Sequence, residues 1–164
     1  MARRVFFSFH YERDIWRANV VRNSWVTQDK GSRWFLGRIP LGRSKEKNDD
    51  AIKRMINKGL EGTSVTVVLI EKETSDRKWV KYEIKESYKK GNGLLGVYIH
   101  NIKGKNGDGY TDTKGDNPFD YIYIERADKK VYFSKMYPTY DWVNDDGYNN
   151  FGDWVEKAAK KAGR

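Results

Sequence analysis

The chain has 164 residues, 38% of them hydrophobic, and 32 Lys and Arg against 23 Asp and Glu give it a net charge of +9. A chain of this length can bury a stable hydrophobic core without disulfides or structural metals, and we expect a single domain over residues 1–164. With no cysteine, disulfides and thiolate metal sites are excluded. The positive charge favours anionic partners. Nucleic acid is a disfavoured partner, because the basic residues of a nucleic-acid-binding surface cluster, whereas those of this chain are scattered.

The hydrophobic segments of the sequence are short. No apolar run approaches the length of a membrane span, and Val5-Phe6-Phe7 is far shorter than the apolar region of a signal peptide. We therefore expect no membrane association and a cytoplasmic location.

The amino-terminal region predicts a strand followed by a helix. Residues 4–9 predict a buried strand, because the apolar residues Val5, Phe6, Phe7 and Phe9 do not alternate with polar ones, and helical spacing follows over residues 13–25. Residues 8–11 then form the first strand-to-helix loop, at the edge where open α/β sheets bind ligands. His10 in this loop has no second histidine or carboxylate at metal-ligand spacing near it, so we expect no metal site.

The next region carries weaker signals. Trp34-Phe35-Leu36 is the best candidate for a second strand, because glycines and Pro40 interrupt the sequence around it. A helix should begin at Asp49 or Asp50, continue to Lys58 and stop at Gly59.

The middle of the chain gives the clearest pattern. Residues 64–70 predict a strand, Thr74 or Ser75 can cap the helix that follows, and this helix ends at Gly91. Residues 94–99 predict the next strand. Successive β-α units of this kind indicate a doubly wound, flavodoxin-like α/β domain with a mostly parallel sheet of about five strands.

The carboxyl-terminal third contains a polar loop and shorter elements. Residues 101–118 match neither a phosphate-binding P-loop nor a calcium loop. Residues 120–125 and 130–134 form a hairpin around Ala127-Asp128, or one of them supplies an edge strand. A last strand over residues 137–142 and a helix over 148–162 should complete the sheet and cover it, with Trp142 and Trp154 in the core.

One acidic residue on the predicted helix after residue 74 differs from its neighbours. Glu86 has Lys89 and Lys90 at salt-bridging spacing, whereas Glu83 has no basic residue at helical spacing and lies one turn from Trp79. Two interpretations of Glu83 remain open on pattern alone: a solvated surface carboxylate, or a functional acid beside an indole at the ligand-binding edge of the sheet.

Several segments resemble a known family. Residues 75–84 resemble the Ser…Trp-x-x-x-Glu-Leu/Ile signature of Toll/interleukin receptor (TIR) domains, and residues 4–11 are similar to the "VFISY" strand motif of those domains. More narrowly, residues 5–11, 19–26, 117–121 and 140–148 resemble the bacterial TIR-like family that supplies the sensor subunit of Thoeris antiphage systems. The segment 38–43 departs from the family pattern because it lacks an acidic residue.

The resemblance implies an enzyme that cleaves the nicotinamide-ribose bond of NAD and makes a cyclic ADP-ribose-type signal, or ADP-ribose, in antiphage defence. NAD is then the substrate and no cofactor is expected. The diffusible product would activate a partner effector, and a homo-oligomer or a phage-derived trigger would switch the enzyme on. The alternative is a non-catalytic TIR-like module, in which Trp79 and the 38–43 loop serve assembly.

The resemblance also suggests roles for individual residues. Glu83 would be the catalytic carboxylate, with Trp79 stacked on nicotinamide or ribose. The remaining candidates would bind substrate: Ser75 and Lys78 at the mouth, Phe9, His10 and Tyr11 on the adenosine side, and Arg38 in the loop beside the site. Phe9 has an alternative role as a core residue.

Overall fold

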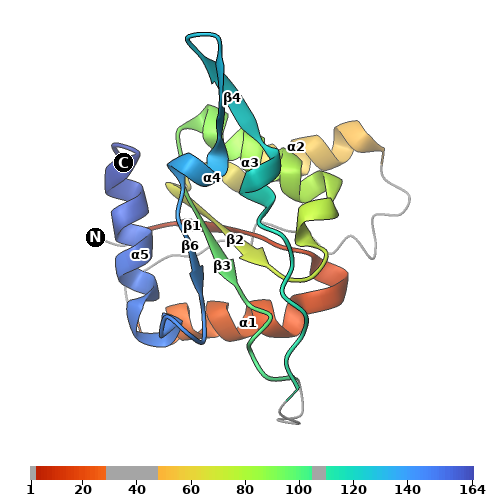
Figure 1. Ribbon diagram of the computed structural model, residues 1–164, viewed down its shortest axis with the longest axis vertical. Helices are drawn as coiled ribbons and strands as arrows, with labels where there is room; N and C mark the ends of the chain where they lie inside the picture. Colours follow the sequence, from red (N-terminus) through yellow and green to blue (C-terminus); the bar gives the residue numbers. More distant parts are fainter. Residues whose placement is uncertain (1–2, 29–47, 105–109) are drawn as a thin grey trace.

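A parallel sheet of four strands forms the centre of the protein, with helices on both faces (Figure 1). The computed structural model of the chain describes residues 3–28, 48–104 and 110–164. In order across the sheet, the strands are β1 (Val5–Ser8), β2 (Val65–Ile70), β3 (Gly93–Tyr98) and β6 (Thr139–Asp141). The predicted α/β class with a parallel sheet is confirmed, while the candidate strand at 34–36 lies outside the described residues.

The two faces of the sheet bury separate cores, because successive residues of a strand point to opposite sides. One face packs against α1 (Tyr11–Gln28) and α5 (Gly147–Lys161). Its core includes Val5, Phe7, Val67, Leu95, Val21, Trp25, Trp142, Phe151 and Val155. The other face packs against α2 (Asp49–Leu60) and α3 (Lys78–Lys90). Its core includes Phe6, Val68, Ile70, Leu94, Ile52, Ile56, Val80 and Ile84.

All strand pairings in this sheet are parallel, which brings distant segments to one edge. Val5 pairs with Val65, and Val65 pairs in turn with Gly93. The carboxyl ends of β1 and β2, at Ser8 and Ile70, therefore lie at the same edge of the sheet. No helix among the described residues is long and apolar enough to cross a membrane.

The start of α2 follows the prediction, but its end does not. The side chain of Asn48 caps the helix by accepting a hydrogen bond of 2.9 Å from the backbone N–H of Ala51. The predicted stop at Gly59 is wrong, because Gly59 is buried inside the last turn and the helix continues to Leu60. Gly62 supplies the left-handed residue after the helix, with φ +74°.

The predicted cap of α3 by Thr74 or Ser75 is also wrong. These residues lie in a 3-10 helix, η2 (Thr74–Asp76), and α3 begins later, after Arg77. The Thr74 hydroxyl is already used, because it accepts a hydrogen bond of 2.9 Å from the N–H of Glu71. At its other end α3 stops where predicted, at Gly91, which is left-handed with φ 85°.

A separate two-stranded sheet projects from the domain (Figure 1). It is an antiparallel hairpin of β4 (Tyr123–Arg126) and β5 (Lys129–Tyr132). Ala127 and Asp128 both have positive φ, as the mirror-image turns of tight hairpins require. Of the two sequence alternatives, the hairpin is confirmed. Two short elements flank it, η3 (Pro118–Tyr121) and α4 (Phe133–Met136).

Candidate functional site

Glu83 lies inside the protein and contacts the first strand. Its side chain has no exposed surface, and its carboxylate accepts a hydrogen bond from the hydroxyl of Ser8, the last residue of β1. The sequence left open whether Glu83 is a solvated surface carboxylate, and the burial excludes that interpretation. The predicted surface role of Glu86 is confirmed, because Glu86 forms an ion pair of 3.2 Å with Lys89.

The fold explains why Ser8 and Glu83 meet. Ser8 is two residues after Phe6, so both side chains point to the sheet face that α2 and α3 cover. On α3, Glu83 precedes Ile84, whose side chain is fully buried against that face. Ser8 was not among the predicted site residues. A polar residue inside the apolar run of residues 5–9, on the same face as the later helix, was the available signal.

A second serine fixes α3 to the sheet next to this pair. The Ser87 hydroxyl donates a hydrogen bond of 2.7 Å to the backbone carbonyl of Glu83, and it lies 2.7 Å from the hydroxyl of Thr66 on β2. All three residues are buried. These contacts fasten the backbone of α3 to the sheet, whereas Ser8 is the residue that contacts the Glu83 carboxylate itself.

Trp79 is half-buried and packs against α2. The indole packs against the core group of Phe6, Ile52, Ile56 and Leu60 and makes an edge-on contact with Tyr82, with ring centroids 5.7 Å apart. Lys78 places its ammonium 4.8 Å from the centre of the same indole and forms an exposed ion pair of 2.6 Å with Asp49. Trp79 therefore joins α3 to α2, one turn away from Glu83.

The other predicted residues are distributed around this edge. Phe9 is fully buried in the core on the α1 and α5 side, opposite to Ser8, which is the alternative core role that the sequence allowed. Ser75 is buried in η2, and Tyr11 is the first residue of α1. Arg38 lies outside the described residues.

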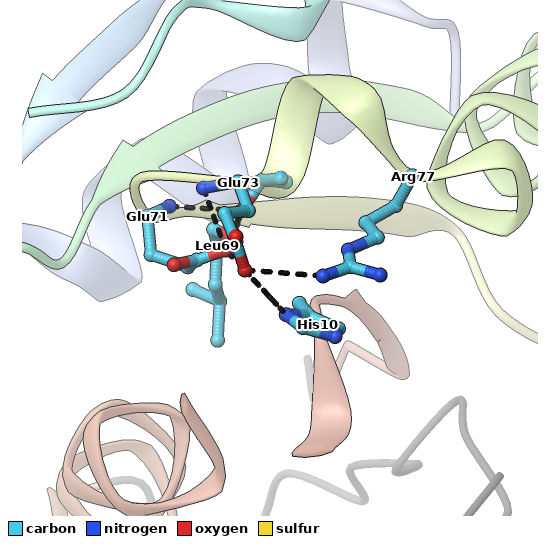
Figure 2. Close-up of polar contacts among 6 residues, drawn as sticks. His10, Leu69, Glu71, Glu73 and Arg77 are labelled. Carbon is cyan, nitrogen blue, oxygen red and sulfur yellow. Dashed lines mark hydrogen bonds and ion pairs between the residues drawn. The ribbon is translucent and has the colours of Figure 1, made fainter. Parts of the chain in front are cut away.

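His10 is buried beside two glutamates at the carboxyl end of β2 (Figure 2). Its Nδ1 atom lies 3.7 Å from Glu71 Oε1 and 4.0 Å from Glu73 Oε2. Glu71 is fully buried, and its Oε1 also accepts a hydrogen bond of 2.9 Å from the N–H of Glu73. The sequence showed no carboxylate at metal-ligand spacing near His10, and the fold corrects this because parallel strands bring Glu71 and Glu73 to the same edge as His10.

This cluster has the composition of a cation site. The three potential ligand atoms lie within 4.8 Å of one another, and one imidazole with two carboxylates suits a divalent transition metal. A protein cation already balances part of the charge, since Arg77 Nη2 lies 3.1 Å from Glu73 Oε2. The cluster places the imidazole of His10, two residues after Ser8, at the same edge of the sheet as Glu83.

Comparisons with known proteins identify the family of the chain. A family model described as "Thoeris protein ThsB, TIR-like domain" matches residues 6–104, a range that contains Ser8, His10, Glu71 and Glu83. The chain is also similar to "Putative cyclic ADP-D-ribose synthase ThsB1" of Bacillus cereus (strain MSX-D12). The two are 40% identical over 193 aligned residues, which cover 94% of this chain and 100% of the relative. The chain therefore belongs to the ThsB TIR-like family of Thoeris proteins.

Proposed function

We propose that this protein cleaves the nicotinamide-ribose bond of NAD and converts the remainder to a cyclic ADP-ribose-type signal in Thoeris antiphage defence. The observation that carries the proposal is the buried Glu83 carboxylate, held by the Ser8 hydroxyl at the ligand-binding edge of a parallel sheet. The name of the relative from Bacillus cereus, "Putative cyclic ADP-D-ribose synthase ThsB1", supports the same reaction class.

The chemistry of the bond explains why one carboxylate matters. Loss of nicotinamide leaves an oxocarbenium-like ribose, and a carboxylate close to it stabilises the developing positive charge. In a buried site this stabilisation is larger than in water, because the surroundings screen the charges less. Glu83 would supply that charge, and Ser8 would hold the carboxylate in one orientation. A hydroxyl of the same substrate can then attack the ribose to close a cyclic product, while attack by water gives ADP-ribose.

The remaining residues have roles in the proposal that follow from their positions. His10 and Tyr11 would contact the adenosine side, Ser75 and Lys78 the mouth of the site, and Trp79 the nicotinamide or ribose. Arg38 would belong to the loop beside the site. Phe9 would support the site from the core, because its side chain is fully buried on the other face of the sheet.

Burial of Glu83 also bears on regulation. A carboxylate without exposed surface cannot contact NAD until the site opens, so this conformation suits a resting enzyme. We propose that self-assembly or a phage-derived trigger populates the open form, and that the product reaches a partner effector by diffusion in the cytoplasm. NAD serves as substrate, with no further cofactor.

A non-catalytic assembly module is the second candidate. It is favoured by the packing of Trp79 against α2, which gives that indole a structural role without any substrate. In this alternative the family fold is kept and the carboxylate of Glu83 is only a buried contact of α3 with β1.

Mass spectrometry of NAD incubated with the protein distinguishes the two. We expect nicotinamide and a cyclic ADP-ribose isomer from protein isolated from phage-infected cells, and little of either from uninfected cells. Protein from both sources that leaves NAD intact, at concentrations where the chain assembles, would support the assembly module instead.

A further inference from the structure

A pocket lies at the edge of the sheet opposite to the carboxyl ends of the strands. It has a volume of about 590 Å³, and its floor includes Gly93 and Leu94, the first residues of β3. Because the sheet is parallel, this amino-terminal edge is remote from Ser8, which ends β1. The pocket is therefore separate from the candidate active site. Its walls come from α5 on one side and from α4 and the start of β6 on the other.

The charge of the pocket lining has one sign. Arg126, Lys135, Lys157 and Lys161 line it, and among the described residues of the lining none is Asp or Glu. Lys161 reaches across the pocket, since its ammonium donates a hydrogen bond of 2.5 Å to the carbonyl of Met136 in α4. An ammonium has three donors, so two remain for a ligand. The lining is complementary to an anion.

The inner walls are aromatic and apolar. Tyr140 and Trp154 stack on each other with ring centroids 4.1 Å apart and planes 6° from parallel, and both line the pocket. Tyr137 and Met136 line it from the α4 side. Cations together with aromatic walls match a flat ring attached to phosphate, and the volume falls in the range of small-ligand sites.

We propose that this pocket is a second nucleotide site, which binds a nucleoside diphosphate or a ligand of the same chemistry. The phosphates lie among Lys135, Lys157 and Lys161, and the base lies against the aromatic wall. A mononucleotide fits a pocket of this volume, whereas a nucleic-acid strand needs a basic surface that continues beyond one pocket. The inference does not depend on the proposed NAD cleavage.

Calorimetric titration of the full chain with ADP tests the proposal. We expect one ADP per chain, with adenosine and inorganic phosphate each binding more weakly than ADP. Lys157→Ala and Lys161→Ala should each weaken ADP binding roughly tenfold, because each removes a charge-assisted hydrogen bond. Ala162→Trp places a large side chain at an exposed position of the lining and should block the pocket.

Lys160→Ala is the matched control, because Lys160 is on the same helix and is exposed but does not line the pocket. It should bind ADP like the unmodified protein, as should Glu83→Gln. ADP affinity that falls in Glu83→Gln and is unchanged in the Lys157 and Lys161 variants would place ADP in the active site and overturn the proposal. Three other results would also overturn the proposal. They are absence of ADP binding, an affinity for inorganic phosphate equal to that for ADP, and tighter binding of a single-stranded oligonucleotide at the same lysines.

Discussion

The hydroxyl of Ser8 donates a hydrogen bond to the carboxylate of Glu83, joining the end of β1 to the middle of α3 across 75 positions of sequence. Both side chains are buried, so the bond is shielded from water and the carboxylate has a fixed orientation. An acid that must meet one atom of a sugar benefits from such a fixed position.

Glu83→Gln should abolish NAD turnover and leave the melting temperature unchanged or slightly raised. The amide keeps the shape and can still accept the Ser8 hydrogen bond, but it removes the charge, and a buried charge is costly to keep. Nicotinamide release followed by chromatography, with thermal unfolding in parallel, checks both parts. Glu86→Gln changes a partly exposed residue of the same helix and should be silent in both measurements.

Ser8→Ala should lower NAD turnover roughly tenfold or more through misplacement of Glu83. Stability should fall by about 1–3 kcal/mol, because a buried carboxylate loses a donor. Urea unfolding and steady-state kinetics measure the two effects.

Ser87→Ala is the matched control for that change. Ser87 is also a buried serine in the same contact between α3 and the sheet, but its hydroxyl bonds the backbone carbonyl of Glu83 and the hydroxyl of Thr66, not the Glu83 carboxylate. We expect a similar loss of stability with activity retained. Equal loss of activity in both variants would mean that Ser8 acts only through the stability of the α3 contact.

Trp79→Ala should cost about 2–3 kcal/mol of stability, somewhat less than a fully buried tryptophan, since the indole is half-buried against α2. Trp79→Phe restores most of the packing and separates the two roles of the side chain. Recovery of stability without recovery of NAD turnover would assign the indole a contact with substrate. Full activity of Trp79→Ala would remove Trp79 from the site.

Specific activity should rise more steeply than linearly with protein concentration. If the open form is populated at about 1%, turnover per molecule falls about a hundredfold although the Glu83 carboxylate is intact. Rate measurements over a dilution series, with and without a crowding agent, detect this. High activity per molecule that stays constant on dilution would show that one chain completes its own site.

Acidification should destabilise the protein below about pH 6.5 through His100. Burial lowers the pKa of His100, an effect that the Asp141 carboxylate 4.0 Å away partly opposes. With a lower pKa in the folded state, the unfolded chain binds the proton first, so stability is kept above pH 6.5 and lost as the pH falls. The loss reaches at most about 1.4 kcal/mol per pH unit for one group. His100→Gln should flatten the dependence of the free energy of urea unfolding on pH between pH 5 and 7. If that dependence is unchanged in the variant, other titrating groups cause it.

Local patterns in the sequence predicted most of the fold. The continuous apolar run of residues 64–70, the glycine stop at Gly91 and the turn at Ala127-Asp128 each have one dominant local cause, and the structure confirms them. The cap at Thr74 failed because a hydroxyl that could cap α3 instead bonds the backbone of Glu71. The capping propensity of a residue does not determine from which of two nearby backbone N–H groups its hydroxyl accepts a hydrogen bond.

The site was predictable only in part, because its contacts are distant in sequence. Helical spacing singled out Glu83 by its lack of a basic neighbour, but spacing carries no information about Ser8 on another element. The same holds for His10 and Glu71, which follow β1 and β2 and meet only when those strands pair. Parallel strands end at one edge of the sheet, so every polar residue that directly follows a predicted strand is a candidate for the site. By that criterion the sequence also indicates Glu71.

The parallel pairing of β1 with β2 also determines when the site can form during synthesis. Val5 of β1 can pair only after Val65 of β2 has left the ribosome, and Glu83 can bind Ser8 only after α3 has been synthesised. Until β2 has been made, the apolar strand β1 has no partner, and β2 in turn lacks β3 until residues 93–98 follow; such segments self-associate readily. Long-range pairing is slow compared with helix formation. We therefore expect a larger soluble fraction when the chain is produced slowly, at low temperature, than when it is produced fast.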